Sequence, residues 1–153
     1  MWLPDETFKS VIQHTPLISI DLIVRNQQNE VLLGKRVNAP AKGYWFVPGG
    51  RVRKNETLDD AFVRLVKEEL GIESGITRAD AKFLGVFEHF YDDCVFGDDV
   101  STHYIVLGYN ITIEDKKNDN FLNLDKQHTS FIWVNDKRVF LKKNIHKNIL
   151  YYF

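Results

Sequence analysis

Two adjacent carboxylates, Glu68 and Glu69, follow a glycine pair, Gly49-Gly50, further along the chain. Carboxylate and backbone carbonyl oxygens are hard ligands, the kind that hold Mg²⁺ against phosphate groups. Residues 49–56 indicate a glycine-rich loop, and that loop leads into a helix whose last turn carries both glutamates. The pattern predicts a metal and phosphate site there.

The helix that positions these carboxylates is predicted over residues 57–70. Thr57 and Asp60 form a variant of the capping box at its start, and Gly71 supplies the stop at its end. Apolar residues recur at helical spacing and are expected to face the core: Leu58, Ala61, Phe62, Leu65, Val66 and Leu70. The helix is therefore amphipathic, with one stripe packed against the rest of the protein.

The remaining elements alternate along the chain. Helices are indicated by residues 5–13 and, near the C-terminus, by Leu141, Ile145, Ile149 and Tyr152. β-rich runs predict strands over residues 16–25, 30–36, 44–47, 82–91, 104–111 and 131–134, the first two forming a hairpin. An acidic loop is expected over residues 92–99 and a long polar loop over residues 114–126. Strands and helices interleave around one sheet, which predicts an α+β fold in a single domain, residues 1–153.

Length, charge and cysteine content exclude several classes of protein. A chain of 153 residues suits one domain with a substantial core. A formal net charge of −1 argues against non-specific nucleic-acid binding. The single cysteine, Cys94, cannot form an internal disulfide, which favours a reducing compartment. Because there is no signal-peptide pattern and no apolar run approaches about 18 residues, we expect a cytoplasmic protein without a membrane partner.

The glycine, glutamate and arginine positions of residues 50–72 resemble the Nudix signature. That signature is G, five residues, E, seven residues, then R-E-U-x-E-E-x-G-U, with U apolar; the matching residues are Gly50, Glu56, Arg64, Glu68, Glu69, Gly71 and Ile72. A pattern of this length is far more specific than a lone glycine-rich loop. The resemblance implies a Nudix hydrolase domain with the Nudix fold, a mixed β-sheet sandwiched between α-helices (α/β/α).

Leu65 is the departure from this pattern, because leucine stands where the signature has its first paired glutamate. A hydrocarbon side chain neither binds a metal nor accepts a proton, and on the apolar stripe of the helix its structural role is packing. Nudix enzymes use clustered glutamates to hold several cations and, in some cases, to activate the attacking water. We therefore expect this site to hold fewer metal ions and to take its general base from elsewhere.

Segments on both sides of the signature narrow the resemblance to GDP-mannose mannosyl hydrolases, a Nudix subfamily. The similarity runs from near residue 3 to about residue 134 and is closest over residues 33–36, 43–51, 89–93, 102–104 and 127–128. It implies Mg²⁺-dependent hydrolysis of GDP-mannose to GDP and free hexose, by water attack at the anomeric carbon with inversion. GDP-glucose stays open as a second substrate. A homodimer and a bacterial surface-polysaccharide pathway are also implied.

The same resemblance implies the metal ligands position by position. One Mg²⁺ per site, replaceable by Mn²⁺, would be bound by the Gly49 carbonyl, the Glu69 carboxylate and the Gln127 side-chain oxygen. All three are oxygen donors, and substrate phosphates with water can complete an octahedron. The subfamily does not require Glu68, which we expect to be exposed.

Arg36, Arg51 and Tyr104 are implied as partners of the GDP leaving group, whose charge they would stabilise as the sugar departs. Asp21 would stabilise an oxocarbenium-like sugar, and His89 would orient the sugar hydroxyls. A second interpretation of Asp21 stays open, because a charge within an apolar strand can also protect a sheet edge from aggregation.

His128 is the expected general base. An imidazole has an ordinary pKa of about 6.5, which suits proton removal from water at neutral pH. Because His128 adjoins Gln127, we expect one loop, residues 124–128, to close over the site and deliver the metal ligand and the base together.

Two other functions stay open. A conventional Nudix pyrophosphohydrolase would attack phosphorus and release GMP and a sugar phosphate; Leu65, Gln127 and His128 argue against it. A non-catalytic Nudix domain would bind a nucleotide sugar without turnover, and the retained Glu69 and the two arginines argue against that.

Overall fold

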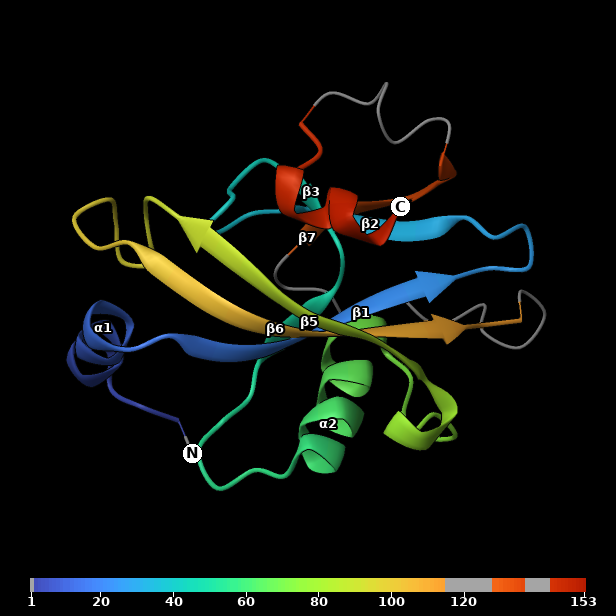
Figure 1. Ribbon diagram of the computed structural model, residues 1–153, viewed down its shortest axis with the longest axis horizontal. Coiled ribbons are helices and arrows are strands. Elements are labelled where there is room, and N and C mark those ends of the chain that lie inside the picture. Colours follow the sequence, from blue (N-terminus) through green and yellow to red (C-terminus); the bar gives the residue numbers. More distant parts are fainter. Residues whose placement is uncertain (1, 115–127, 137–143) are drawn as a thin grey trace.

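The computed structural model (Figure 1) describes residues 2–114, 128–136 and 144–153, and for residues 128 and 129 only the backbone. Most predicted elements are found at their predicted positions. In chain order they are α1 (Asp5–His14), β1 (Leu17–Arg25), β2 (Val31–Arg36), β3 (Trp45–Phe46), β4 (Gly49–Arg51), α2 (Leu58–Leu70), the 3-10 helix η1 (Arg78–Asp80), β5 (Lys82–Tyr91), β6 (Thr102–Thr112), β7 (His128–Val134) and the 3-10 helix η2 (Lys147–Tyr152).

The strands form one mixed sheet with β1 near its centre. The main strand order is β3-β2-β1-β6-β5, with β4 paired to β1 and β7 paired to β2. β1 and β6 run parallel, whereas β1 is antiparallel to both β2 and β4. At Asp21 the neighbours are Gly49 of β4 on one side and Gly108 of β6 on the other. The interpretation of Asp21 as an edge-protecting charge is therefore wrong, because its strand has partners on both sides.

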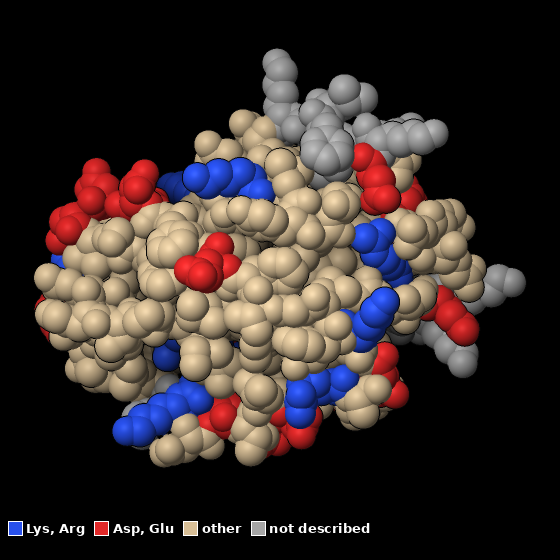
Figure 2. All heavy atoms as spheres, viewed as in Figure 1, with Lys and Arg blue, Asp and Glu red and all other residues tan. Residues whose placement is uncertain are grey.

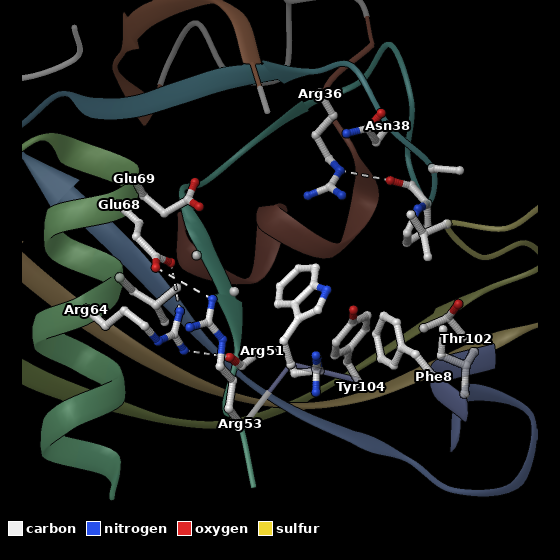
Figure 3. Close-up of a pocket in the computed structure, with 18 residues that line it drawn as sticks. Phe8, Arg36, Asn38, Arg51, Arg53, Arg64, Glu68, Glu69, Thr102 and Tyr104 are labelled. Carbon is white, nitrogen blue, oxygen red and sulfur yellow. Dashed lines mark hydrogen bonds and ion pairs between the residues drawn. The ribbon is translucent and has the colours of Figure 1, made fainter. Parts of the chain in front are cut away.

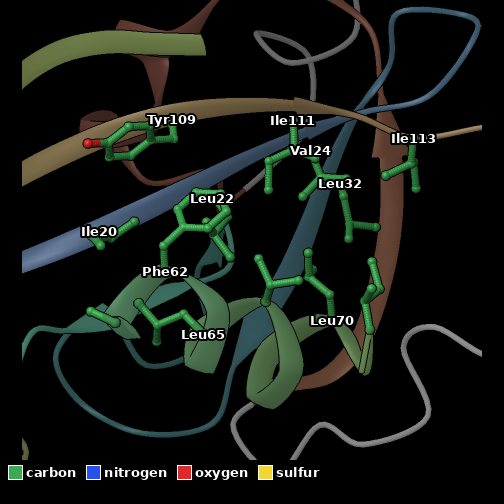
Figure 4. Close-up of a cluster of buried hydrophobic side chains, with 13 residues drawn as sticks. Ile20, Leu22, Val24, Leu32, Phe62, Leu65, Leu70, Tyr109, Ile111 and Ile113 are labelled. Carbon is green, nitrogen blue, oxygen red and sulfur yellow. The ribbon is translucent and has the colours of Figure 1, made fainter. Parts of the chain in front are cut away.

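Helix α2 covers one face of the sheet and forms the larger core (Figure 4). Its predicted ends are confirmed: the Thr57 side chain accepts a hydrogen bond from the Asp60 backbone N–H, and Gly71 ends the helix in the left-handed conformation. Leu65 and Phe62 pack against Ile20 and other buried residues of this core, namely Leu22, Val24, Leu32, Leu70 and Ile111. The apolar stripe thus holds the glutamate-bearing turn against the central strands.

The 3-10 helix η2 covers the opposite face, so the sheet lies between helical layers (Figure 1). Its residues Ile149 and Tyr152 pack with Ile23 of β1 in a second core cluster. The predicted C-terminal helix is therefore present only as the 3-10 helix Lys147–Tyr152. Ile145, expected on that helix, instead forms a bridge with Trp45, and Leu141 lies outside the described residues.

Helix α1 is fastened to the acidic loop between β5 and β6. Lys9 forms an ion pair with Asp99, with 2.8 Å between Nζ and Oδ2. Beneath this pair, Ile12 packs with Cys94 and Val100 of the loop. Figure 2 shows acidic side chains gathered at this end of the molecule. These contacts fix α1 beside the ends of the central strands.

The short strand β4 is a difference from the prediction, which placed a glycine-rich loop over residues 49–56. Residues 49–51 instead pair with β1, and a Cβ atom on Gly49 would clash with the Ile20 carbonyl oxygen. Only glycine allows this approach.

No helix within residues 2–114, 128–136 and 144–153 has the length and apolar character needed to cross a bilayer.

Candidate active site

A cavity of about 330 Å³ opens between α1, β4 and α2 (Figure 3). Its volume falls within the usual range for small-molecule sites. Figure 3 shows Glu68, Glu69 and Arg64 on the α2 side, Phe8, Tyr104 and Thr102 on another, and Arg36 with Asn38 on a third. Charged groups of the signature therefore face an aromatic wall across one cavity.

A smaller cavity of about 60 Å³ adjoins the first and reaches into the sheet. The two share the lining residues Arg36, Pro40, Gly49, Gly50, Arg51 and Tyr104. The inner cavity adds Asp21, His89 and Tyr91. The described residues that were predicted to bind the substrate therefore all line the inner cavity, namely Asp21, Arg36, Arg51, His89 and Tyr104.

Asp21 lies buried at the floor of the inner cavity. The Tyr152 hydroxyl donates a hydrogen bond to Oδ2 of Asp21 at 2.7 Å. Burial raises the pKa of Asp21 to about 7, although the Tyr152 hydrogen bond and the charge of Arg36 both act to lower it. In its ionised form, this buried carboxylate can stabilise a positive charge that develops near it.

His89 lines the same inner cavity as Asp21 and is only 2% exposed. Its Nε2 atom has no hydrogen-bond partner within the described part of the chain. Burial, followed by the nearby His146, lowers the pKa of His89 to about 4, so the imidazole is neutral at physiological pH. Since buried polar atoms are nearly always paired in folded proteins, an unpaired ring nitrogen at a cavity wall indicates a ligand group.

Arg36, Arg51 and Tyr104 converge where the two cavities meet. The Arg36 Nε donates to the Pro40 carbonyl at 2.8 Å, and the Arg51 guanidinium lies over the Phe8 ring, 4.2 Å from its centroid. Burial raises the pKa of Tyr104 although both arginines act to lower it, so its hydroxyl keeps its proton. Two cations and one hydroxyl donor here suit an anionic group.

The signature residues Glu56 and Arg64 hold the loop in place. Arg64 Nε donates to Glu56 Oε1 at 2.6 Å, and Arg64 Nη2 donates to the Arg51 carbonyl at 2.9 Å. Glu56 Oε2 accepts from the Arg53 backbone N–H at 2.9 Å. The hydrogen bond from Arg64 is the main reason that the pKa of Glu56 falls to about 2. These two residues therefore tie helix α2 to the strand that carries Arg51.

Glu69 is buried and its carboxylate is directed into the outer cavity (Figure 3). Gly49 lines the same cavity from β4. A Cβ atom on Gly50 would lie 2.7 Å from Leu65 Cδ2, so glycine lets β4 approach α2 closely. In the residues that the structure describes, no three His, Cys, Asp or Glu side chains group as a metal cluster. The Glu69 carboxylate and the Gly49 carbonyl are both oxygen donors, the type of ligand that suits a hard divalent cation.

Glu68 is exposed, as expected, but it is not isolated. Arg64 Nη1 donates to Glu68 Oε2 at 2.9 Å, and Arg53 Nη2 lies 3.5 Å from Glu68 Oε1. Leu65, by contrast, is 2% exposed and packs in the core while it lines the cavity beside Glu69. The position of the missing glutamate is therefore filled by hydrocarbon.

Gln127 lies outside the described residues, as do residues 124–126 of the predicted gate, so the roles of Gln127 and the gate stay predictions. The backbone of His128 begins β7 and pairs with Arg36 of β2. Because Arg36 lines both cavities, this pairing brings the chain at His128 to the edge of the site. The role of the His128 side chain also stays a prediction.

The unpredicted residues at the site include Trp2, Phe8, Arg53, Tyr91 and Tyr152. Tyr152 was expected only as an apolar marker of a helix. A buried tyrosine hydroxyl needs a partner, and the isolated Asp21 within an apolar strand needs one too. The sequence could therefore indicate that each of these side chains requires a hydrogen-bond partner. It could not indicate that Tyr152 and Asp21 bind each other.

Comparison with known proteins identifies the class. The NUDIX domain family matches residues 15–153, so the chain belongs to the Nudix hydrolase family, whose members generally use a divalent metal such as Mg²⁺. The low-salt glycan biosynthesis protein Agl8 of Haloferax volcanii is 44% identical over 127 residues, which are 83% of this chain and 76% of Agl8. An ADP-ribose pyrophosphatase of Methanocaldococcus jannaschii is 44% identical over 57 residues, 37% of this chain and 33% of that protein.

Solved structures support the fold. A MutT protein from Methanosarcina mazei Go1 superimposes with a TM-score of 0.68 at 21% identity, covering 91% of each chain. The NUDIX domain of Shewanella oneidensis NrtR, solved in complex with ADP ribose, gives a TM-score of 0.63 at 15% identity and covers 96% of this chain and 93% of that one. The predicted Nudix fold is confirmed.

Proposed function

We propose that this Nudix protein hydrolyses GDP-mannose to GDP and free mannose, by water attack at the anomeric carbon with inversion. The observation that carries the proposal is the inner cavity, whose lining combines buried Asp21 and His89 with Arg36 and Arg51. A pyrophosphatase needs its reactive groups at phosphorus. Buried polar groups next to the two arginines instead support a sugar that lies beyond the diphosphate.

The diphosphate is the leaving group in this proposal. Arg36, Arg51 and the Tyr104 hydroxyl meet it where the two cavities join, and they stabilise the charge that develops on its β-phosphate. One Mg²⁺, held by Gly49, Glu69 and Gln127, supplies further charge neutralisation when bound. The remaining coordination positions suit phosphate oxygens and water.

The sugar occupies the inner cavity. As the bond to GDP breaks, the anomeric carbon becomes positive, and the ionised Asp21 carboxylate stabilises that charge. Tyr152 holds Asp21 in position through its 2.7 Å hydrogen bond. The neutral His89 ring offers Nε2 to a sugar hydroxyl, which would satisfy its missing hydrogen bond.

His128 is the general base that takes a proton from the attacking water. Its backbone pairs with Arg36 of β2. In the proposed reaction the attacking water lies on the face of the sugar opposite GDP, so a single displacement inverts the configuration. The helix cannot supply this base from position 65, because Leu65 has no proton acceptor.

The glycan-related name of the Haloferax volcanii relative supports a nucleotide-sugar substrate and a role in polysaccharide synthesis. We also propose that the protein is cytoplasmic and forms a homodimer. Light scattering of the purified protein tests the dimer: a mass near twice 17.9 kDa is expected, and a mass near 17.9 kDa would reject it.

A conventional pyrophosphohydrolase is the second candidate, favoured by two observations. Glu68 and Glu69 are both retained, and the match to an ADP-ribose pyrophosphatase covers 57 residues. That activity would release GMP and mannose 1-phosphate. The buried leucine at position 65 removes a carboxylate from the side of the site where phosphorus would react.

Product analysis separates the candidates. The protein is incubated with Mg²⁺ and GDP-mannose, and nucleotides and sugars are resolved by anion-exchange chromatography. GDP with free mannose is expected, and a His128→Ala variant should lose this activity while a Thr129→Ala variant keeps it. GMP with a sugar phosphate would establish the second candidate, and binding of GDP-mannose without any product would establish a non-catalytic domain.

A further inference from the structure

The inner cavity is lined by Asp21 and His89, and it is the smaller of the two adjoining cavities. Under the proposed function, on which this inference rests, it holds the sugar, while the arginines at its mouth hold the diphosphate. The nucleoside then has one direction left, into the outer cavity of about 330 Å³. The base must therefore meet a wall of the outer cavity.

Two aromatic rings of the N-terminal segment line that outer cavity, Trp2 and Phe8. The Phe8 ring is already engaged: the Arg51 guanidinium covers it at 4.2 Å, and the Phe96 ring meets it edge to face at 5.9 Å. The Trp2 indole has Arg53 as its neighbour, 5.5 Å from the ring centroid, and the residue is 78% exposed. Trp2 is thus the aromatic side chain that offers a free face.

A tryptophan exposed to this extent beside a ligand cavity is unfavourable in water, because its large apolar surface stays hydrated. It is nevertheless held in place. Arg53, against which the indole rests, lies 3.5 Å from Glu68, and Glu68 accepts a hydrogen bond from Arg64 at 2.9 Å. Glu68 therefore connects the signature helix to the aromatic side chain through Arg53.

We propose that Trp2 is the stacking platform for the purine base of the nucleoside-diphosphate substrate, and that Glu68 positions it through Arg53. Stacking of a base on an aromatic ring tolerates different bases, because every base has a π-face. The platform therefore contributes affinity for the nucleoside rather than a choice between guanine and adenine. Glu68, which is not among the proposed Mg²⁺ ligands, thereby has a role in binding the base.

The test compares two ligands that share the diphosphate and differ in the nucleoside. Affinities for GDP and for pyrophosphate are measured by calorimetry in Mg²⁺, with the full chain and no added residues at its N-terminus. Trp2→Ala is expected to weaken GDP binding by roughly 10- to 100-fold and to leave pyrophosphate binding unchanged within about 2-fold. Trp2→Phe should retain most of the GDP affinity.

Tyr151→Ala is the matched control, because Tyr151 is an aromatic residue that is 66% exposed and lines a different cavity. It should change neither affinity. Glu68→Gln should lower the ratio of GDP to pyrophosphate affinity by a smaller factor than Trp2→Ala. Equal losses for both ligands, or no loss of GDP affinity in Trp2→Ala, would overturn the role of Trp2. An unchanged ratio in Glu68→Gln would overturn the role of Glu68.

These measurements need no turnover, so they are independent of the reaction chemistry. If the protein converts GDP-mannose to GMP and mannose 1-phosphate, the proposed function fails while the ratio of affinities still reports on Trp2. If it releases GDP and mannose but the ratio does not change, the proposed function stands and the platform is rejected.

Discussion

Asp21→Asn should make the protein more stable, because the buried native carboxylate opposes folding. It should also make the protein less active, because the proposed reaction uses this carboxylate to stabilise the sugar. The substitution keeps the side-chain shape, and the amide oxygen can still accept the Tyr152 hydroxyl proton. In the folded protein the pKa of Asp21 is raised from 3.8 to about 7 by burial. Between these values the folded state binds more protons than the unfolded state, so this group lowers stability as pH rises from about 4 to about 7.

The magnitude follows from the two pKa values. At about pH 4.5 the carboxyl is largely protonated in the fold and only partly so in the unfolded chain, which costs about 1 kcal/mol. At about pH 8.5 it is ionised in both states, and the cost reaches about 4 kcal/mol. Replacing the carboxyl should therefore be about 3 kcal/mol more stabilising at the higher pH.

Urea unfolding of both proteins at the two pH values measures this double difference in the metal-free protein. Asp98→Asn, which alters an exposed aspartate on the β5–β6 loop, is the control and should show no such difference. Activity on GDP-mannose should fall by about 100-fold or more in Asp21→Asn. A stability change that is the same at both pH values would refute the account that burial raises the pKa of Asp21.

Three further perturbations test the site. Tyr152→Phe removes the hydrogen bond to Asp21 and should lower kcat/KM by roughly 10-fold to 100-fold in steady-state assays; an unchanged value would remove Tyr152 from the site. Glu56→Gln should lose about 1–2 kcal/mol at neutral pH in urea unfolding. Because the pKa of Glu56 is lowered from 4.5 to about 2, that loss should vanish as pH falls through this range. Leu65→Ala should cost about 2–5 kcal/mol by thermal unfolding, and Val63→Ala, at an exposed position of the same helix, far less.

Local patterns in the sequence were sufficient for the element that carries the glutamates. Thr57 caps α2 and Gly71 ends it, because capping depends on residues within a few positions of each other. The same reasoning located β5 at residues 82–91. Site residues that the family resemblance supplied, among them Arg36, were also brought together as expected.

Features that depend on pairing across the chain were not predictable from local patterns. β4 exists because β1 offers it a partner, and Gly49-Gly50 alone indicates only a turn. The 3-10 form of η2 and its contact with Asp21 likewise depend on where the C-terminus meets the sheet. The two interpretations of Asp21 could be separated only once β1 was seen to be internal.

The central claim is that water attacks carbon and not phosphorus. The most direct measurement is hydrolysis of GDP-mannose in oxygen-18 water, followed by mass spectrometry of the nucleotide product. The account predicts GDP without label, because the oxygen between the β-phosphate and the sugar leaves with GDP. Label in GDP, or labelled GMP or sugar phosphate, would show attack at phosphorus and contradict it.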